Sequence, residues 1–273
     1  MLDALIVTPG SSADLRGRDP RDMLGLSGKD EGKARLAALT DELSSFQERL
    51  YAEGKRSVLL VLQGLDASGK DGTIRHVFTG VNPQGCHVTS FKVPTPNELA
   101  HDFLWRVHAE CPARGMIGIF NRSHYEDVVT VGVLGLAPEK IWRKRPGRIV
   151  EFEQLLVEEG TTVLKCFLHV SAEEQRKRFE ERQSDPTKAW KYNPGDEETN
   201  RRYDEFTAAY DDAISATSTE HAPWHVVPAD RNWLRNLAVA TVLVETLRRL
   251  DPRFPEIPAE EIPAQDSPRS VDL

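Results

Sequence analysis

One segment of the chain has the residue types and spacing of a phosphate-binding loop. It reads GLDASGK over residues 64–70 and matches the G-x-x-x-x-G-K pattern. Glycines let backbone N–H groups converge on an anion, the following helix start adds positive potential, and the lysine neutralises phosphate oxygens. An apolar run, residues 57–63, precedes the loop and a helical pattern follows, which favours a functional loop over a chance glycine-rich turn. The expected phosphate-binding residues are Gly64, Ala67, Ser68, Gly69, Lys70, Asp71, Gly72, Thr73 and Arg75.

The loop departs from the common pattern in its acidic residues. Asp71 stands where Ser or Thr usually supplies a hydroxyl to Mg²⁺, and Thr73 comes two residues later. Asp66 lies inside the loop itself, where a carboxylate repels phosphate unless a cation lies between them. Two interpretations of Asp66 stay open. It binds Mg²⁺ or handles a proton of the acceptor, or it only turns the loop through bonds to its own backbone.

A second polar cluster follows the apolar run 116–120. Polar groups at the carboxyl end of a parallel strand line the usual ligand crevice. Asn121 and Asp127 are candidate metal ligands, and Arg122 is a candidate partner of phosphate. Glu126 is a ligand or a base, and His124 is either a general base or a structural hydrogen-bonding group.

A third set is basic and follows Ser171 on a predicted helix. Arg178 and Arg182 are four residues apart and therefore share one face of that helix. We expect the helix and the polar loop 184–196, which contains Lys188 and Trp190, to cover the phosphates as a lid. Acidic residues alternate with these bases, so a solvated, salt-bridged face is the alternative. The basic run 140–148 allows the same two interpretations.

The elements that must position these residues alternate between helical and apolar patterns. Leucine and phenylalanine recur at helical spacing from Leu36 to Leu50, and Gly54 is a plausible stop. Capping-box patterns begin at Thr95 and Ser171. The apolar runs are continuous rather than alternating, which predicts strands buried on both faces. They are residues 57–63, 88–91, 116–120, 162–170 and 225–227. Strand–helix alternation predicts a three-layer α/β/α fold with a parallel sheet.

Composition excludes several classes of protein. The chain has 273 residues, of which 39% are hydrophobic and 29% charged, and no stretch reaches the roughly 18–20 apolar residues of a membrane span. The net charge of −8 argues against a general nucleic-acid binder. Three distant cysteines give neither a disulfide framework nor a zinc spacing, and the first residues lack the pattern of a secretory signal. We expect a cytoplasmic protein that binds neither membrane nor nucleic acid.

The two ends of the chain differ from its middle. Residues 1–30 are rich in Gly, Asp, Ser and Arg without periodicity, which predicts an extended or partly disordered lead-in. Five prolines fall between Pro252 and Pro268 among acidic residues. The segment 251–273 is therefore expected to be a disordered acidic tail. The domain between them covers residues 31–250.

Taken together, these motifs resemble the polyphosphate kinase 2 family. The resemblance spans about residues 20–250. It rests on the segments GLDASGKDGTIRH, VNPQGCHVTSFKVPTPNELAHDFLWR, FNRSHYEDV, DPTKAWKYNP and HAPWHVVPADRNWLRN, in that order. HYEDV at 124–128 is the form of the subgroup that accepts both AMP and ADP.

The resemblance implies a P-loop kinase fold like that of thymidylate kinase, with a helical lid at about residues 171–215. It implies Mg²⁺-dependent, reversible phosphoryl transfer from inorganic polyphosphate to AMP or ADP, with Mn²⁺ as an alternative ion and guanine as an alternative base. It also implies a homo-oligomer. Because the acceptor is itself an ionised phosphate, no strong general base is required.

The resemblance also assigns residues to roles. Catalytic roles fall on Asp66, Lys70, Arg122 and Asp127, and phosphate-binding lid roles on Arg178 and Arg182. Metal ligation falls on Asp66, Asn121 and Asp127, although Asn121 stands where other subgroups carry Asp. Nucleotide binding is expected of Lys92, Pro94, Thr95, Arg106, Asn121, Arg122, Glu126, Lys188 and Trp190. Trp190 either stacks on a base or packs within the lid.

Three other functions compete with this one. An ATP-dependent nucleoside monophosphate kinase of the same fold is disfavoured by Asp66 and Asp71. A non-catalytic nucleotide-binding regulator is disfavoured by the intact loop, carboxylates and lid arginines. A polyanion-binding module is disfavoured by the negative net charge.

Overall fold

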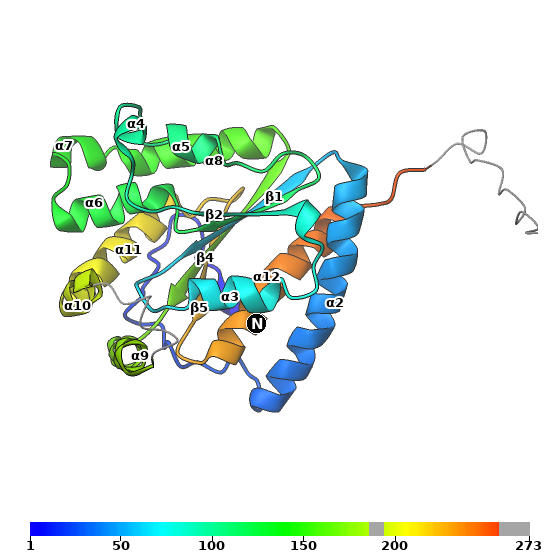
Figure 1. Cartoon of the computed structure of the whole chain (residues 1–273), viewed down its shortest axis with the longest axis horizontal. Helices are drawn as coiled ribbons and strands as arrows, with labels where there is room; N and C mark the ends of the chain where they lie inside the picture. The colour runs from blue at the N-terminus through cyan, green and yellow to red at the C-terminus, as the bar shows by residue number, and fades with distance from the viewer. Residues whose placement is uncertain (186–193, 257–273) are drawn as a thin grey trace, which may run out of the picture.

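A five-stranded parallel sheet forms the centre of the molecule (Figure 1). The computed structural model describes residues 1–185 and 194–256. The strands are β1 (Ser57–Gln63), β2 (Cys86–Ser90), β3 (Ile117–Asn121), β4 (Thr161–His169) and β5 (Trp224–Pro228). Their order is β2-β3-β1-β4-β5, and Val58 of β1 lies opposite Ile117 and Thr162. The five strands coincide, within two residues, with the five predicted apolar runs.

Helices cover both faces of this sheet (Figure 1). One face carries α2 (Lys29–Glu53), α3 (Lys70–Val77) and α12 (Asn232–Leu250), and the other carries α6 (Val129–Leu134), α8 (Arg145–Glu158) and α11 (Tyr203–Thr217). The other helices are α1 (Leu2–Leu5), α4 (Pro96–Leu99), α5 (Trp105–His108), α7 (Glu139–Trp142), α9 (Ala172–Ser184) and α10 (Pro194–Arg201), with 3₁₀ turns η1 (Pro83–Gly85) and η2 (His124–Asp127). The predicted three-layer α/β/α fold is confirmed. No described helix is long and apolar enough to cross a membrane.

The predicted start and stop signals act locally as expected. Gly54 takes a left-handed conformation (φ 62°) and its N–H bonds to the carbonyl of Leu50, which ends α2. Thr95 and Glu98 form a complete capping box at α4. At α9 the hydroxyl of Ser171 accepts from the N–H of Glu174. These contacts fix where each helix begins or ends.

One strand does not fit the expectation of burial on both faces. β2 is an edge strand, and Val88 at its centre is 47% exposed. An apolar run predicts a strand, but its position in the sheet is decided by topology, and the edge position leaves β2 covered on fewer sides.

The N-terminal segment corrects the expectation of a partly disordered lead-in. Leu5, Val7, Ala13 and Leu15 are fully or almost fully buried in the core, and Ile6 forms an antiparallel bridge to β5. The segment therefore covers the outer edge of β5, which would otherwise be open. Apolar residues scattered among polar ones give no period, which is why the sequence pattern missed this packing. Residues 257–273 of the predicted tail lie outside the described residues.

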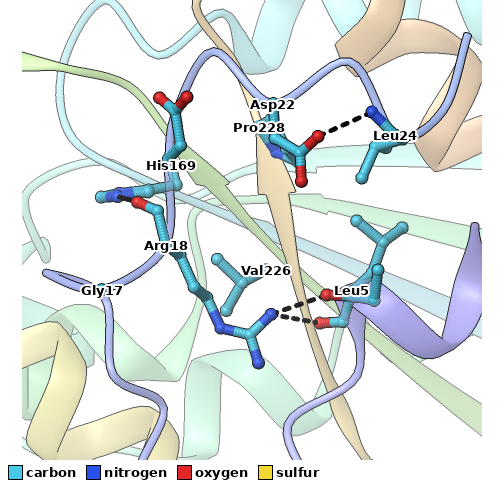
Figure 2. Close-up of a pocket in the computed structure, with 10 residues that line it drawn as sticks. Leu5, Gly17, Arg18, Asp22, Leu24, His169, Val226 and Pro228 are labelled. Carbon is cyan, nitrogen blue, oxygen red and sulfur yellow. Dashed lines mark hydrogen bonds between the residues drawn. The ribbon is translucent and has the colours of Figure 1, made fainter.

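A cavity of about 290 Å³ lies where this segment meets the ends of β4 and β5 (Figure 2). Arg18 fills one side and donates to the carbonyls of Ala4 (2.8 Å) and Leu5 (3.5 Å). Asp22 accepts from the N–H of Leu24, and His169 contacts the carbonyl of Arg18. These polar groups hold the N-terminal segment in place.

The predicted lid, residues 171–215, is divided between two parts of the fold. α9 and α10 lie beside the carboxyl ends of the strands (Figure 1). In α11, Phe206, Tyr210 and Ile214 are buried in the core. This helix is therefore part of the body of the domain, and a lid can comprise only the segment before it.

A buried ion pair joins β4 to α8 inside the core. Lys165 donates to Glu153 (2.5 Å), and neither side chain is exposed to solvent. Tyr125 and His124 of η2 also contact Glu153, at 2.9 and 3.3 Å. Burial alone would raise the pKa of Glu153, but Lys165 and His124 lower it below its usual value. His124 is thus a buried structural group rather than a general base.

Replacing Lys165 by Met should lower the free energy of unfolding by about 3–5 kcal/mol, because it leaves the carboxylate of Glu153 buried without its cation. Urea denaturation of the full chain measures this loss, and Lys55→Met at an exposed position is the control. A loss of under about 1 kcal/mol would contradict a structural role for this pair.

Candidate active site

The phosphate loop connects β1 to α3 in the predicted way. Gly64 and Gly69 take positive φ angles of 149° and 102°, and Ala67 is held at 60°. Such backbone angles are rare outside glycine and are retained mainly at functional sites. The ammonium of Lys70 folds back and donates to the carbonyls of Gly64 (2.6 Å) and Leu65 (3.2 Å). The lysine at the end of the loop is thus hydrogen-bonded to the beginning of the loop.

Asp66 of the loop forms an ion pair with Arg122, the residue that follows β3. Arg122, at a positive φ of 63° just after β3, also reaches Glu126 at 3.3 Å. Burial alone would raise the pKa of Asp66, but the charges of Arg122 and Lys70 lower it below its usual value. Asp66 is therefore ionised at neutral pH. Glu126 foremost, with Asp66, raises the pKa of Arg122 further above its usual value.

These side chains line one pocket of about 180 Å³. Thr199 of α10 enters it and donates to Asp66 at 3.3 Å. Phe206 and Tyr210 of α11 form its apolar wall. The pocket therefore brings together the phosphate loop, the end of β3 and the segment that follows the predicted lid loop.

The two other predicted metal ligands face elsewhere. Asn121 donates to Asp71 at 2.7 Å. Asp127 lies between Arg106 (3.6 Å) and Arg145 (3.4 Å). Burial raises the pKa of Asp127, although both arginines oppose this shift. The structure therefore does not gather Asp66, Asn121 and Asp127 into one ligand set.

The residues present nevertheless fit a magnesium ion that is held partly by substrate. Within residues 1–185 and 194–256, no group of three or more His, Cys, Asp or Glu side chains can hold a metal. Mg²⁺ usually keeps several waters and binds through one or two carboxylates plus substrate phosphates. The ionised carboxylate of Asp66, in the pocket beside the loop, meets that requirement.

Arg178 supports the phosphate loop through hydrogen bonds to backbone carbonyls. It donates to the carbonyls of Ala67 (2.9 Å) and Ser68 (3.2 Å) on one side, and to those of Ala229 (2.8 Å) and Asp230 (2.9 Å) on the other. Its remaining N–H bonds to Glu174. Since a guanidinium has five N–H groups, all are engaged within the protein. Arg178 therefore supports the loop in this structure, and the phosphate-binding role expected of it would require it to leave these partners.

Two other residues that support the loop by hydrogen bonds were not identified from the sequence. Gln175 donates to the carbonyl of Asp66 at 2.9 Å, and Arg235 of α12 donates to that of Ser68 at 3.2 Å. Arg235 is the one charged residue in an apolar stretch, residues 234–244, which is the signal that could have identified it. Thr199, between two charged stretches, offers no such signal.

The other predicted residues divide by environment. Thr73 is buried and faces Asn236 of α12, whereas Arg75 is exposed on α3. Arg182 lies close enough to lower the pKa of Asp66, and its guanidinium covers Phe179. Arg106 is buried and donates to the carbonyl of Lys92, which ties the segment holding Pro94 and Thr95 to α5. Lys188 and Trp190 lie outside the described residues.

We expect the affinity for a phosphate chain to fall as the pH rises through about 8. Burial, reinforced by the charge of Arg122, lowers the pKa of Lys70 to about 8, so the free protein loses this cation above that pH. A bound anion favours the charged form, and binding then requires proton uptake. Titration calorimetry with tripolyphosphate between pH 6.5 and 9.5 measures the effect. Lys70→Arg should move the fall to higher pH, and an unchanged profile would contradict the assignment.

Comparisons with known proteins identify the family of this chain. The family model "Polyphosphate kinase 2 (PPK2)" matches residues 26–255. An AMP/ADP-polyphosphate phosphotransferase of Meiothermus ruber is 52% identical over 251 residues, which cover 92% of this chain and 94% of that protein. An ADP-polyphosphate phosphotransferase of Rhodopseudomonas palustris is 45% identical over 233 residues, 81% of each chain.

A solved structure shows the same fold. The crystal structure of polyphosphate kinase 2 from Arthrobacter aurescens TC1 superposes with a TM-score of 0.89 at 43% sequence identity, over 93% of this chain and 91% of that one. The residues matched by the family model, 26–255, include the phosphate loop, Arg122 and the helices α9 and α12. The chain belongs to the polyphosphate kinase 2 family.

Proposed function

We propose that this protein transfers a phosphoryl group from inorganic polyphosphate to AMP and to ADP. One observation carries the proposal: the ionised Asp66 and Arg122 form an ion pair in the pocket beside the phosphate loop, close enough to Lys70 for the charges of all three to influence one another. The names of the Meiothermus ruber and Rhodopseudomonas palustris relatives, both polyphosphate phosphotransferases, support the same chemistry. The ATP-dependent nucleoside monophosphate kinase is not favoured.

The residues of the pocket have separate tasks in this reaction. Lys70 exchanges its two carbonyl partners for oxygens of the phosphate chain and neutralises part of its charge. Arg122, held between Asp66 and Glu126, stabilises charge on the group in transfer. Phosphoryl transfer needs mainly positioning and charge neutralisation, so no residue has to act as a strong base.

Asp66 would hold Mg²⁺, which when bound would screen the phosphates of donor and acceptor from one another. The ionised state of Asp66 fits this task, as does its place inside the loop. Asn121 and Asp127 remain candidate ligands in our proposal, but both would have to leave their present partners, Asp71 and the two arginines. Mn²⁺ is the alternative ion.

The remaining aspects of the proposal concern the setting of the enzyme. All three cysteines are free, which supports a reducing compartment and hence the cytoplasm. A homo-oligomer and the use of guanine nucleotides are further parts of the proposal, and they rest on the family resemblance alone.

The first experiment gives the purified protein Mg²⁺ and long-chain polyphosphate, with AMP in one reaction and ADP in another. Chromatography resolves the nucleotides. We expect ADP and ATP from AMP, and ATP from ADP. Product from ADP alone would contradict the acceptance of AMP. Activity only with ATP as donor would replace the proposal by the ordinary nucleotide kinase.

Asp66→Asn and Lys70→Met should each lower kcat by at least about 10³-fold, because the first removes the carboxylate that would hold Mg²⁺ and the second removes a cation that neutralises the phosphate chain. The far-ultraviolet circular dichroism spectrum should remain that of the unchanged protein. Lys55→Met, which removes an exposed cation, is the matched control and should retain full activity. Wild-type turnover in either site variant would overturn the assignment of the site.

A further inference from the structure

Arg235 lies against the backbone of the phosphate loop and does not line the pocket. It belongs to the first turn of α12 and is only 2% exposed. Its Nη1 donates to the carbonyl of Ser68 at 3.2 Å. A Cβ atom added to Gly69 would lie 1.8 Å from the same nitrogen, so the guanidinium is packed against the loop backbone. The charge is thus held against the backbone that cradles phosphate.

This buried cation has only neutral partners. Nη1 also donates to Asn232 Oδ1 at 2.7 Å, and Nε and Nη2 donate to Asn236 Oδ1 at 3.2 and 2.9 Å. In the part of the chain that the structure describes, no carboxylate forms an ion pair with Arg235. Burial lowers the pKa of Arg235, and the like charge of Arg178 lowers it further. The environment therefore disfavours the positive charge in the free protein.

A buried charge is ordinarily paired, because leaving water without a counter-charge is unfavourable. Lys165 in the same protein follows this rule through Glu153. At Arg235 the hydrogen bonds are satisfied but the charge is not balanced. A glutamine could donate to Ser68 or to Asn236 without any charge. The positive charge itself therefore requires a reason, and the anion that binds on the other face of the loop provides one.

We propose that Arg235 is a positioning residue whose counter-ion is the bound phosphate chain, on which it acts through the loop backbone. This inference rests on the proposed function. Arg235 does not touch substrate, since the backbone of Ser68 and Gly69 lies between them. Because water is excluded from the guanidinium, its field is less screened than that of a surface arginine. Binding of the phosphate chain thus supplies the negative charge that Arg235 lacks in the free protein.

The alternative is that Arg235 only attaches α12 to the loop. Asn236→Asp separates the two roles, because it keeps the size of the side chain and the acceptor oxygen but gives Arg235 a buried carboxylate. If the charge serves the donor, internal neutralisation weakens donor binding while leaving the fold as stable as before. If Arg235 only attaches α12, the stronger pair leaves donor binding unchanged.

The experiment measures the dissociation constant of tripolyphosphate by titration calorimetry, together with the unfolding temperature of each full-length variant. Asn236→Asp should weaken binding by about tenfold or more with no fall in unfolding temperature. Arg235→Met should weaken binding to a similar extent, and Arg235→Lys should stay within about threefold of the unchanged protein. Asn82→Asp makes the same change at the cap of η1, at the other end of the sheet, and is the control.

Wild-type affinity in Asn236→Asp or in Arg235→Met would overturn the proposal. An unfolding temperature that falls with the affinity in Asn236→Asp would show a structural role and would also overturn it. Turnover of the unchanged protein with polyphosphate, measured beforehand, tests the proposed function separately. Failure there contradicts both proposals, whereas normal turnover with unaltered binding in the variants contradicts this one alone.

Discussion

The phosphate loop keeps its shape through hydrogen bonds from other helices to the backbone carbonyls of its middle residues. Gln175, Arg178 and Arg235 donate to the carbonyls of Asp66, Ala67 and Ser68. In a trans peptide the N–H of the next residue points opposite to the carbonyl. Holding the carbonyls therefore directs the N–H groups of Ala67 and Gly69 to the opposite side of the loop, where we propose that phosphate binds. A loop with rare backbone angles keeps this shape because side chains outside it determine it.

The strand order explains how residues distant in sequence reach the loop. β4 lies beside β1 and β5 lies beside β4, so the segments that leave their carboxyl ends begin at the same edge of the sheet as the loop and on one side of it. α9, which follows β4, carries Gln175 and Arg178, and α12, which follows β5, carries Arg235. On the other side, β3 brings Arg122 and Glu126 to the pocket. The residues that support the loop therefore follow β4 and β5, whereas the pocket residues Arg122 and Glu126 follow β3 on the other side of β1.

Much of this arrangement could be predicted from the sequence, because the signals were local. The glycine spacing of the loop, the five apolar runs and the caps at Gly54 and Thr95 each depend on a few adjacent residues. Contacts between residues that are distant in sequence had no such local signal. Arg178 was assigned to phosphate because its type and position suit an anion, yet its acceptors are backbone carbonyls, which every residue possesses. The direction of Asp127 likewise depends on Arg106 and Arg145, which sequence alone does not place beside it.

Two buried cations show why the partner of a charge says more about its role than its burial does. Lys165 and Arg235 are both almost inaccessible to water. Glu153 balances Lys165 within the core, and this pair holds β4, α8 and η2 together whether or not a ligand is bound. Arg235 has amide and carbonyl oxygens around it, which satisfy its N–H groups but leave its charge in place. In our proposal the charge that folding leaves unbalanced is balanced by a bound anion, and the contact of Arg235 with the phosphate loop indicates where that anion would bind.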